Sequence, residues 1–331
     1  MEYRILPRTG WKISVISYGC MSLEQGAEGM GQRALSREQG AEHEDQKSEI
    51  RDQSSEWLLD KAVELGINYF DTADIYDQGQ NEITVGRALR AKRKELYIAT
   101  KVGNQPRSDG TGWDWNPHKE YILEAAEASL KRLQTDYIDL YQLHGGTIED
   151  PIDETIEAFE LLKEQGKIRA YGISSIRPNV IREYVARSNI VSIMMQYSLL
   201  DRRPEESCLE LLQENGIGVM VRGAVAKGLL VGKPAKEYLG YSKEEVSSVA
   251  KKVLQVAGSG LHVDAASFRT PAQTALQFAL RGPGVCSVVA GMRTEEQLLE
   301  NVRAVETPEL SEEGYQELRS VVEPKVYEAH R

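Results

Sequence analysis

Three observations predict an α/β fold of the (β/α)8, or TIM-barrel, class. Short apolar runs alternate with helical patterns along the chain, and eight of these runs each end at a polar or small residue. The runs are mostly apolar on both faces, as buried strands of a parallel sheet are. No G-x-G-x-x-G turn follows any run, which argues against the rival fold, a doubly wound dinucleotide-binding sheet. Because 331 residues suit one barrel, we expect a single domain over residues 1–331.

The strands are expected in a fixed order that begins with a hairpin. Two short alternating runs flank Arg8-Thr9-Gly10 within residues 1–14, and they predict an N-terminal β-hairpin ahead of the barrel. The eight barrel strands are then expected to end at or near the following residues: Gly19, Asp71, Lys101, His144, Ser174, Gln196, Arg222 and Gly291.

The segments between these strands show the three- and four-residue spacing of apolar side chains that is typical of amphipathic helices. A glycine closes several of these segments, as at Gly66, Gly166 and Gly216, and predicts a helix C-terminus there. Three other segments open with an N-terminal capping pattern. These are Thr270-Pro271-Ala272-Gln273, Ser242 with Glu245, and Thr294 with Gln297.

One segment departs from the regular alternation. Residues 23–54 follow the first barrel strand and are polar, glycine-containing and highly charged. Such a segment cannot bury enough apolar surface to fold alone, so we predict a mobile insertion. Loops that follow barrel strands emerge on the C-terminal face, where barrel enzymes hold their active sites. The insertion is therefore either a passive surface loop or a lid over the site.

The composition restricts the class of function. The chain has 51 acidic and 40 basic residues, a net charge of −11, which argues against a nucleic-acid partner. No apolar run reaches the roughly 18 residues of a membrane span, and the N-terminus lacks a secretory signal. Three cysteines without metal-ligand spacing indicate a cytoplasmic protein with neither a disulfide framework nor a metal site. The oligomeric state is not indicated.

Four polar side chains gather at the ends of successive strands. Asp71, Lys101 and His144 end the second, third and fourth strands, and Tyr76 follows shortly after Asp71. A buried lysine and a buried aspartate are each costly alone but tolerable as a pair. The lysine ammonium stabilises a neighbouring phenolate, so a tyrosine beside it can deliver a proton to a carbonyl oxygen. A histidine can donate a hydrogen bond to the same oxygen, and the set suits carbonyl reduction.

Six motifs occur in a specific order: FDTADIYDQGQNE, YIATKVG, DYIDLYQLHGG, GKIRAYGISS, MMQYSLLDRR and GMRTEEQLLEN. Through these motifs the whole chain resembles the aldo-keto reductase family, in its bacterial-type branch. The resemblance implies a barrel plugged at its base by the hairpin, with NADPH extended across the C-terminal face. It also implies a catalytic tetrad, in which Tyr76 donates the proton, Lys101 activates Tyr76, Asp71 holds Lys101 and His144 orients the carbonyl.

The resemblance places the nicotinamide amide against Ser174, Gln196 and, less securely matched, Ser175. Arg222 stands where many family members have an aromatic side chain that stacks on the nicotinamide ring, and a planar guanidinium can stack in its place. The pyrophosphate is expected on the loop that follows Arg222, because small residues let backbone amides approach phosphate and lysines add charge. The loop residues expected to contact it are Gly223, Ala224, Lys227, Gly228 and Lys233.

The adenosine end of the cofactor is expected beyond the eighth strand. Gly291 and Arg293 precede a helix that opens at Thr294, and an arginine at a helix N-terminus suits the 2′-phosphate of NADPH. Asn301 would meet the adenine. Gln297 has two interpretations, a cofactor contact or a capping box with Thr294.

The sequence therefore predicts an NADPH-dependent oxidoreductase that reduces small-molecule aldehydes or ketones, with no membrane partner. One alternative is a cofactor-sensing binding subunit on the same fold, a kind of protein that potassium-channel β subunits exemplify. Another is a Schiff-base aldolase with Lys101 as its nucleophile, which leaves Tyr76 and residues 293–301 unexplained. The physiological substrate is not indicated. Besides the insertion, the residues expected to wall its pocket are Met21, Trp113 and Trp115.

Overall fold

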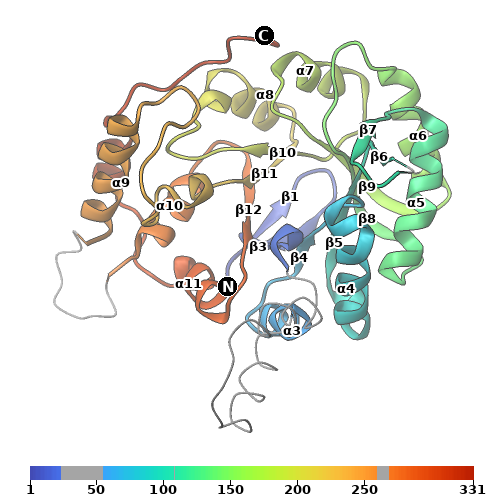
Figure 1. Cartoon of the computed structure of the whole chain (residues 1–331), viewed down its shortest axis with the longest axis horizontal. Coiled ribbons are helices and arrows are strands. Elements are labelled where there is room, and N and C mark those ends of the chain that lie inside the picture. The colour runs from blue at the N-terminus through green and yellow to red at the C-terminus, as the bar shows by residue number, and fades with distance from the viewer. Residues whose placement is uncertain (24–54, 108, 259–267) are drawn as a thin grey trace, which may run out of the picture.

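The computed structural model describes residues 1–23, 55–107, 109–258 and 268–331. In this part of the chain, eight parallel strands close into a barrel in the order β3–β4–β5–β8–β9–β10–β11–β12, with helices around it (Figure 1). The predicted (β/α)8 fold is confirmed. The barrel strands are β3 (Ile16–Gly19), β4 (Tyr69–Asp71), β5 (Tyr97–Val102), β8 (Ile138–Leu143), β9 (Ile168–Ser174), β10 (Ser192–Gln196), β11 (Gly218–Arg222) and β12 (Val285–Gly291).

The predicted N-terminal hairpin is also confirmed. Strands β1 (Tyr3–Leu6) and β2 (Trp11–Ser14) pair antiparallel. Leu6, Trp11 and Ile13 from this hairpin pack in one buried cluster with side chains from the barrel strands, such as Tyr69 and Met220. The hairpin thus closes the N-terminal end of the barrel and leaves the other end for a site.

The helices that surround the barrel bury an apolar side against it. They are α3 (Ser55–Glu64), α4 (Gln80–Leu89), α5 (Lys119–Leu133), α6 (Ile152–Glu164), α7 (Pro178–Arg187), α8 (Cys208–Glu214), α9 (Lys243–Gly258), α10 (Pro271–Leu280), α11 (Glu295–Val302) and α12 (Glu312–Arg319). None of the helices in the described ranges is long and apolar enough to cross a membrane.

The capping patterns behave largely as the sequence predicts. Thr270 and Gln273 form the full reciprocal capping box of α10. Ser242 and Glu245 exchange the same pair of hydrogen bonds ahead of α9. At α11 the result differs from a full box, because the Gln297 side chain accepts from the backbone N–H of Arg293 rather than from the N-cap residue.

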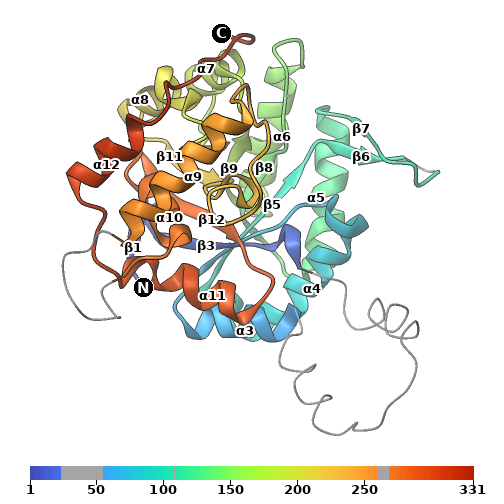
Figure 2. The same cartoon turned by 60° about the vertical axis from the view of Figure 1, so that its left-hand side comes forward.

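A second hairpin, which the sequence patterns did not indicate, follows the third barrel strand. Strands β6 (Asn104–Pro106) and β7 (Trp113–Trp115) pair antiparallel, and Figure 2 shows them standing out from the barrel. Trp115 donates its indole N–H to Asp150 at 3.1 Å, which ties the hairpin to the loop after β8. The predicted insertion at residues 23–54 lies outside the described residues except for Leu23.

Parallel pairing brings the C-terminal strand ends to one face. Gly19 lies beside Asp71, and Lys101 lies beside Gln142. Across the barrel, Gln196 lies beside Arg222. In the closed order of strands, β10 and β11 are diametrically opposite β4 and β5, so two walls of polar side chains face each other across the barrel mouth.

The fit of the hairpin into the barrel base makes a prediction about stability. A Cβ atom at Gly218 would overlap Leu6 and come within 2.9 Å of Cys286 Sγ. We expect Gly218→Ala to lower the free energy of unfolding by about 1–3 kcal/mol, because overpacking displaces the hairpin. The cost should shrink by at least about 0.5 kcal/mol in a Leu6→Ala background, which removes the overlap with Leu6 and leaves only the contact with Cys286. Urea denaturation of the four proteins measures this coupling, and strictly additive effects would contradict it.

Candidate active site

Lys101 and Asp71 form a buried ion pair at the C-terminal ends of β5 and β4. Lys101 Nζ lies 2.5 Å from Asp71 Oδ1 and donates to the carbonyl oxygen of Thr72 at 2.6 Å. The Gln142 amide donates to the other Asp71 oxygen at 3.2 Å. Lys101 is 1% exposed and Asp71 is 4% exposed. Because neither charge is stable alone at this burial, the two side chains act as one unit.

Burial and charge act in opposite directions on this pair. Burial raises the pKa of the Asp71 carboxyl, and the Lys101 ammonium works against that increase. For Lys101, burial disfavours the ammonium, but the Asp71 carboxylate and the Tyr76 hydroxyl outweigh it and raise the pKa of Lys101. Lys101 therefore remains a cation at neutral pH, held in place by Asp71.

The Tyr76 hydroxyl lies against this cation. Lys101 Nζ is 3.4 Å from Tyr76 Oη and 5.0 Å from the centre of the ring. The turn that follows Tyr76 carries left-handed backbone at Asp77 and Gln78, with φ of 50° and 53°. This tight turn directs the tyrosine back over the strand ends. The rings of Tyr76 and His144 meet edge to face at 5.9 Å, so the structure brings all four predicted tetrad residues together.

His144 is a neutral imidazole in this setting. Burial, followed by the charges of Lys101 and Arg222, lowers the pKa of His144 to about 3. Its Nδ1 atom is buried without a hydrogen-bond partner among the described residues. A neutral imidazole carries one N–H donor, which is what a carbonyl oxygen requires.

Two polar residues near the tetrad were not singled out from the sequence. Gln142, which holds Asp71, is a buried polar residue of β8, as Asp139 is, and a polar residue in a strand expected to be buried was the available signal. Asp74 follows β4 and is 7% exposed, with neither carboxylate oxygen bonded to a described residue. Burial and the nearby Glu82 raise the pKa of Asp74 to about 8.

The opposite wall holds the residues expected around the nicotinamide. Ser174, Gln196 and Arg222 end β9, β10 and β11, as the sequence predicts. Arg222 donates to Gln196 Oε1 at 2.8 Å, so these two neighbouring strand ends are linked side chain to side chain. The hydroxyl of Ser175 accepts from the Arg177 N–H, which gives it a role in shaping the local turn.

The loop after β11 combines small residues with lysines. Gly223 and Gly228 adopt left-handed backbone, with φ of 74° and 92°, and Ala224 is buried. A Cβ atom at Gly228 would lie 2.7 Å from Cδ of Lys233, so the absence of a side chain lets Lys233 pack across the loop. Lys227 is exposed. These features suit the approach of a phosphate to backbone amides.

The predicted cofactor residues around α11 differ in their exposure to solvent. Arg293 is exposed just ahead of the helix, and Gly291 is exposed at the end of β12. The Gln297 side chain accepts from the Arg293 N–H at 2.9 Å, which favours the capping interpretation of Gln297. Asn301 is 8% exposed. Among the described residues no carboxylate lies within ion-pair distance of Lys227, Lys233 or Arg293, so these cations fit a phosphate-bearing cofactor.

A buried lysine–aspartate pair beside a tyrosine and a histidine, on the C-terminal face of a barrel, defines a class of carbonyl-reducing oxidoreductase. The chain belongs to the aldo/keto reductase family, whose model matches residues 37–323. Members of this family use nicotinamide cofactors, so the general reaction at the site is oxidation or reduction at a carbonyl or alcohol carbon.

Particular relatives agree with this membership. The chain is 48% identical over 100% of both lengths to "Uncharacterized oxidoreductase YqkF" of Bacillus subtilis. It is 33% identical to the NADH-specific methylglyoxal reductase of Escherichia coli, over 74% of this chain and 80% of that protein. The solved holo form of aldo-keto reductase AKR11C1 from Bacillus halodurans matches with a TM-score of 0.83 and 46% identity, covering 100% of this chain and 99% of that one.

The neutral His144 predicts a pH dependence of stability. The pKa of His144 is about 3 in the folded protein, against about 6.5 for an unfolded histidine, so the unfolded chain binds the extra proton between these values. Stability should therefore be intact above about pH 6.5 and fall by as much as about 1.4 kcal/mol per pH unit below it.

Urea denaturation at pH 7.5 and pH 5 tests this expectation. The wild-type protein should lose more stability between the two pH values than His144→Asn does. The exposed His118 offers the control, since His118→Asn also removes an imidazole. An identical loss in wild type and His144→Asn would show that His144 is not buried in its neutral form.

Proposed function

We propose that the protein is an NADPH-dependent reductase of aldehydes and ketones. The observation that carries this proposal is the convergence of Tyr76, His144 and the Lys101–Asp71 pair on one point of the barrel mouth. A substrate carbonyl oxygen placed there accepts hydrogen bonds from Tyr76 and from neutral His144. Two donors on one oxygen polarise the carbonyl for attack at its carbon.

In this mechanism the nicotinamide, when bound, supplies the hydride. Tyr76 gives its proton to the carbonyl oxygen as charge develops there. The Lys101 ammonium, 3.4 Å away, stabilises the charge left on the Tyr76 oxygen. Asp71 keeps Lys101 in position. The uncharged His144 orients the carbonyl through its N–H, and Tyr76 remains the group that donates the proton.

The preference for NADPH rests on cations along the expected path of the cofactor that have no carboxylate partner in the described part of the chain. Arg293 stands ahead of α11, where a helix N-terminus and a guanidinium together suit a 2′-phosphate. Lys227 and Lys233 flank the loop proposed for the pyrophosphate. The Escherichia coli relative carries the opposite preference, for NADH, in its name.

The substrate is proposed to be a small molecule with an apolar part. Met21 and Trp113 are 69% and 51% exposed, and Trp115 lies partly buried in the β6–β7 hairpin. We propose that these side chains rim the pocket, and that the chain acts as one domain in the cytoplasm without a nucleic-acid partner. The net charge of −11 supports the last point.

The aldolase alternative is disfavoured by the contacts of Lys101. Its Nζ atom already donates to Asp71, to the Thr72 carbonyl and to Tyr76. A raised pKa keeps this nitrogen protonated, whereas a Schiff-base nucleophile must be a free amine. The sensor alternative gains no support from a tetrad that is complete.

Loss of the Tyr76 hydroxyl should affect turnover rather than cofactor binding. We expect Tyr76→Phe to lower kcat for aldehyde reduction by about 100-fold or more, because the hydroxyl acts in the transition state. The dissociation constant for NADPH should change little. Tyr121→Phe, which removes a nearby hydroxyl bonded to the Asn104 carbonyl, is the control and should retain turnover. Near-wild-type kcat in Tyr76→Phe would refute the assignment of the proton donor.

Cofactor preference is tested at Arg293. The wild-type protein should bind NADPH at least about tenfold more tightly than NADH, because the guanidinium pairs with the extra phosphate. Arg293→Ala should remove most of this difference and leave NADH binding unchanged. Lys12→Ala, at an exposed position on the N-terminal hairpin, controls for a general loss of positive charge. Equal affinity of the wild type for both cofactors would refute the preference.

A further inference from the structure

We propose that Arg222 biases the site toward reduced cofactor, because its positive charge has no carboxylate partner among the described residues and stands where the ring of an oxidised nicotinamide would carry its own charge. The inference rests on the proposed function, since it takes a nicotinamide as the hydride source. It goes beyond that function by assigning the favoured direction, carbonyl reduction, to one side chain and the residues that position it.

Arg222 lies half-buried in the barrel mouth, directly opposite the tetrad. It ends β11, which stands across the barrel from β5 and Lys101. The positive charge of Arg222 contributes to lowering the pKa of His144, and it opposes the increase that burial causes in the pKa of Asp71. The guanidinium therefore faces the space in which the reaction takes place.

No carboxylate among the described residues neutralises this guanidinium. Its hydrogen-bond partner is the neutral amide of Gln196. Four other arginines that are not fully exposed are paired with acids: Arg93 with Asp139, Arg132 with Glu82, Arg202 with Glu205 and Arg203 with Asp201. Arg177 and Arg269 donate to backbone carbonyl oxygens instead, and neither ends a barrel strand as Arg222 does. Burying a charge without a counterion is costly. A half-buried guanidinium at this place is therefore consistent with a role toward a ligand bound in the barrel mouth.

Asp201 positions Arg222 through Gln196. The Gln196 Nε2 atom donates to Asp201 Oδ2 at 2.9 Å and to the Tyr238 hydroxyl at 3.1 Å. Asp201 is 2% exposed and also accepts hydrogen bonds from Nε and Nη2 of Arg203, one on each carboxylate oxygen. A reversed Gln196 amide would set its oxygen against the Asp201 carboxylate, so Oε1 must point toward Arg222. Asp201 thus orients the arginine through Gln196, without an ion pair to it.

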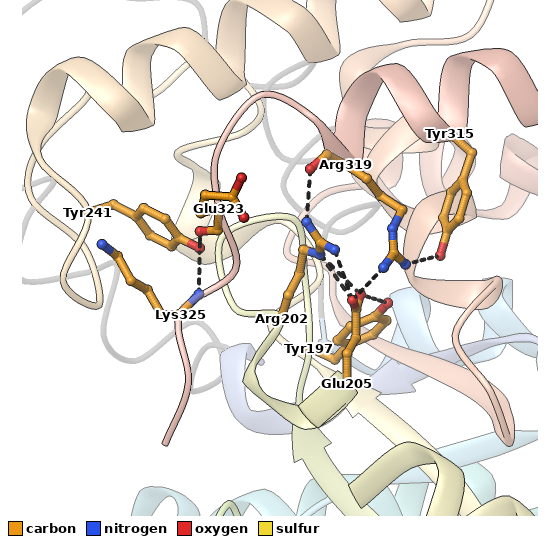
Figure 3. Close-up of polar contacts among 8 residues, drawn as sticks. All are labelled: Tyr197, Arg202, Glu205, Tyr241, Tyr315, Arg319, Glu323 and Lys325. Carbon is orange, nitrogen blue, oxygen red and sulfur yellow. Dashed lines mark hydrogen bonds and ion pairs between the residues drawn. The ribbon is translucent and has the colours of Figure 1, made fainter. Parts of the chain in front are cut away.

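The loop that carries Asp201 is anchored from behind by a separate network. Figure 3 shows Glu205 accepting hydrogen bonds from Tyr197, Arg202 and Arg319, at 2.8 Å, 3.0 Å and 2.9 Å. Arg319 lies at the end of α12, so this network ties the loop to the C-terminal helix. Glu205 forms no hydrogen bond with Gln196 or Arg222, and it therefore provides a matched control for general damage to the loop.

The position of the nicotinamide follows from the chemistry. Hydride transfer requires the donor carbon to approach the carbonyl carbon to about 3–3.5 Å. With the carbonyl oxygen on Tyr76 and His144, a bound nicotinamide would be held between the tetrad and the ends of β10 and β11, where Gln196 and Arg222 would contact it. The ring is uncharged when reduced and carries a positive charge when oxidised. Arg222 therefore repels the oxidised form selectively, which weakens product binding after reduction and opposes the reverse reaction.

The test compares dissociation constants for NADP+ and NADPH, measured by calorimetry on the intact protein. Arg222→Gln keeps a donor for Gln196 but removes the charge, and it should strengthen NADP+ binding relative to NADPH by about tenfold. Arg222→Lys keeps the charge and should retain the wild-type ratio. An unchanged ratio in Arg222→Gln would overturn the proposal. An equal shift in both variants would assign the effect to shape and overturn the electrostatic argument.

Two further variants test the positioning. Asp201→Asn lets the Gln196 amide reverse, and the ratio should move in the same direction as in Arg222→Gln. Glu205→Gln should lower the melting temperature and leave the ratio unchanged; an equal shift there would show that Asp201 acts only by holding the loop. A wild-type protein that binds neither nucleotide would refute the proposed function itself, whereas normal binding with an unresponsive ratio refutes only the role of Arg222.

Discussion

The buried ion pair between Lys101 and Asp71 is the interaction on which the rest of the site depends. Removing one partner of such a pair typically costs about 3–5 kcal/mol, so the ends of β4 and β5 are held in a single arrangement. The Thr72 carbonyl and the Gln142 amide complete the coordination of the two charges. Tyr76 and His144 then lie around a cation whose position is determined by the strands rather than by mobile loops.

The two walls of the barrel mouth differ in how their charged side chains are paired. On the tetrad side a cation is matched by a carboxylate, and the histidine is neutral. On the other side Arg222 has no acidic partner among the described residues. The same holds within those residues for Lys227, Lys233 and Arg293 in the loops beyond. Positive charge thus gathers along the expected path of an anionic cofactor, although the net charge of the protein is −11. Local charge of this kind decides what binds, whatever the overall balance.

Much of the fold and the tetrad could be predicted from the sequence because their signals are local. Apolar runs, capping residues and the polar side chain that ends each run are all properties of neighbouring residues. Parallel strands in a barrel place their C-terminal ends on one face, so Asp71, Lys101 and His144 could be grouped without coordinates. The capping box at Thr270 was predicted by the same local logic, and the structure confirms it.

Contacts between distant segments were decided only by the tertiary structure. The sequence left two roles open for Gln297, and its contact with the Arg293 N–H favours the cap. Gln142 on Asp71 and Asp201 on Gln196 depend on which strands become neighbours when the barrel closes. The partner of Arg222, the neutral amide of Gln196, likewise depends on tertiary structure, because a chain with 51 acids does not reveal which of them lie close to a given arginine. The sequence alone determined the fold and the tetrad, whereas burial and partner choice, which set charge and pKa, arose only when remote segments were packed together.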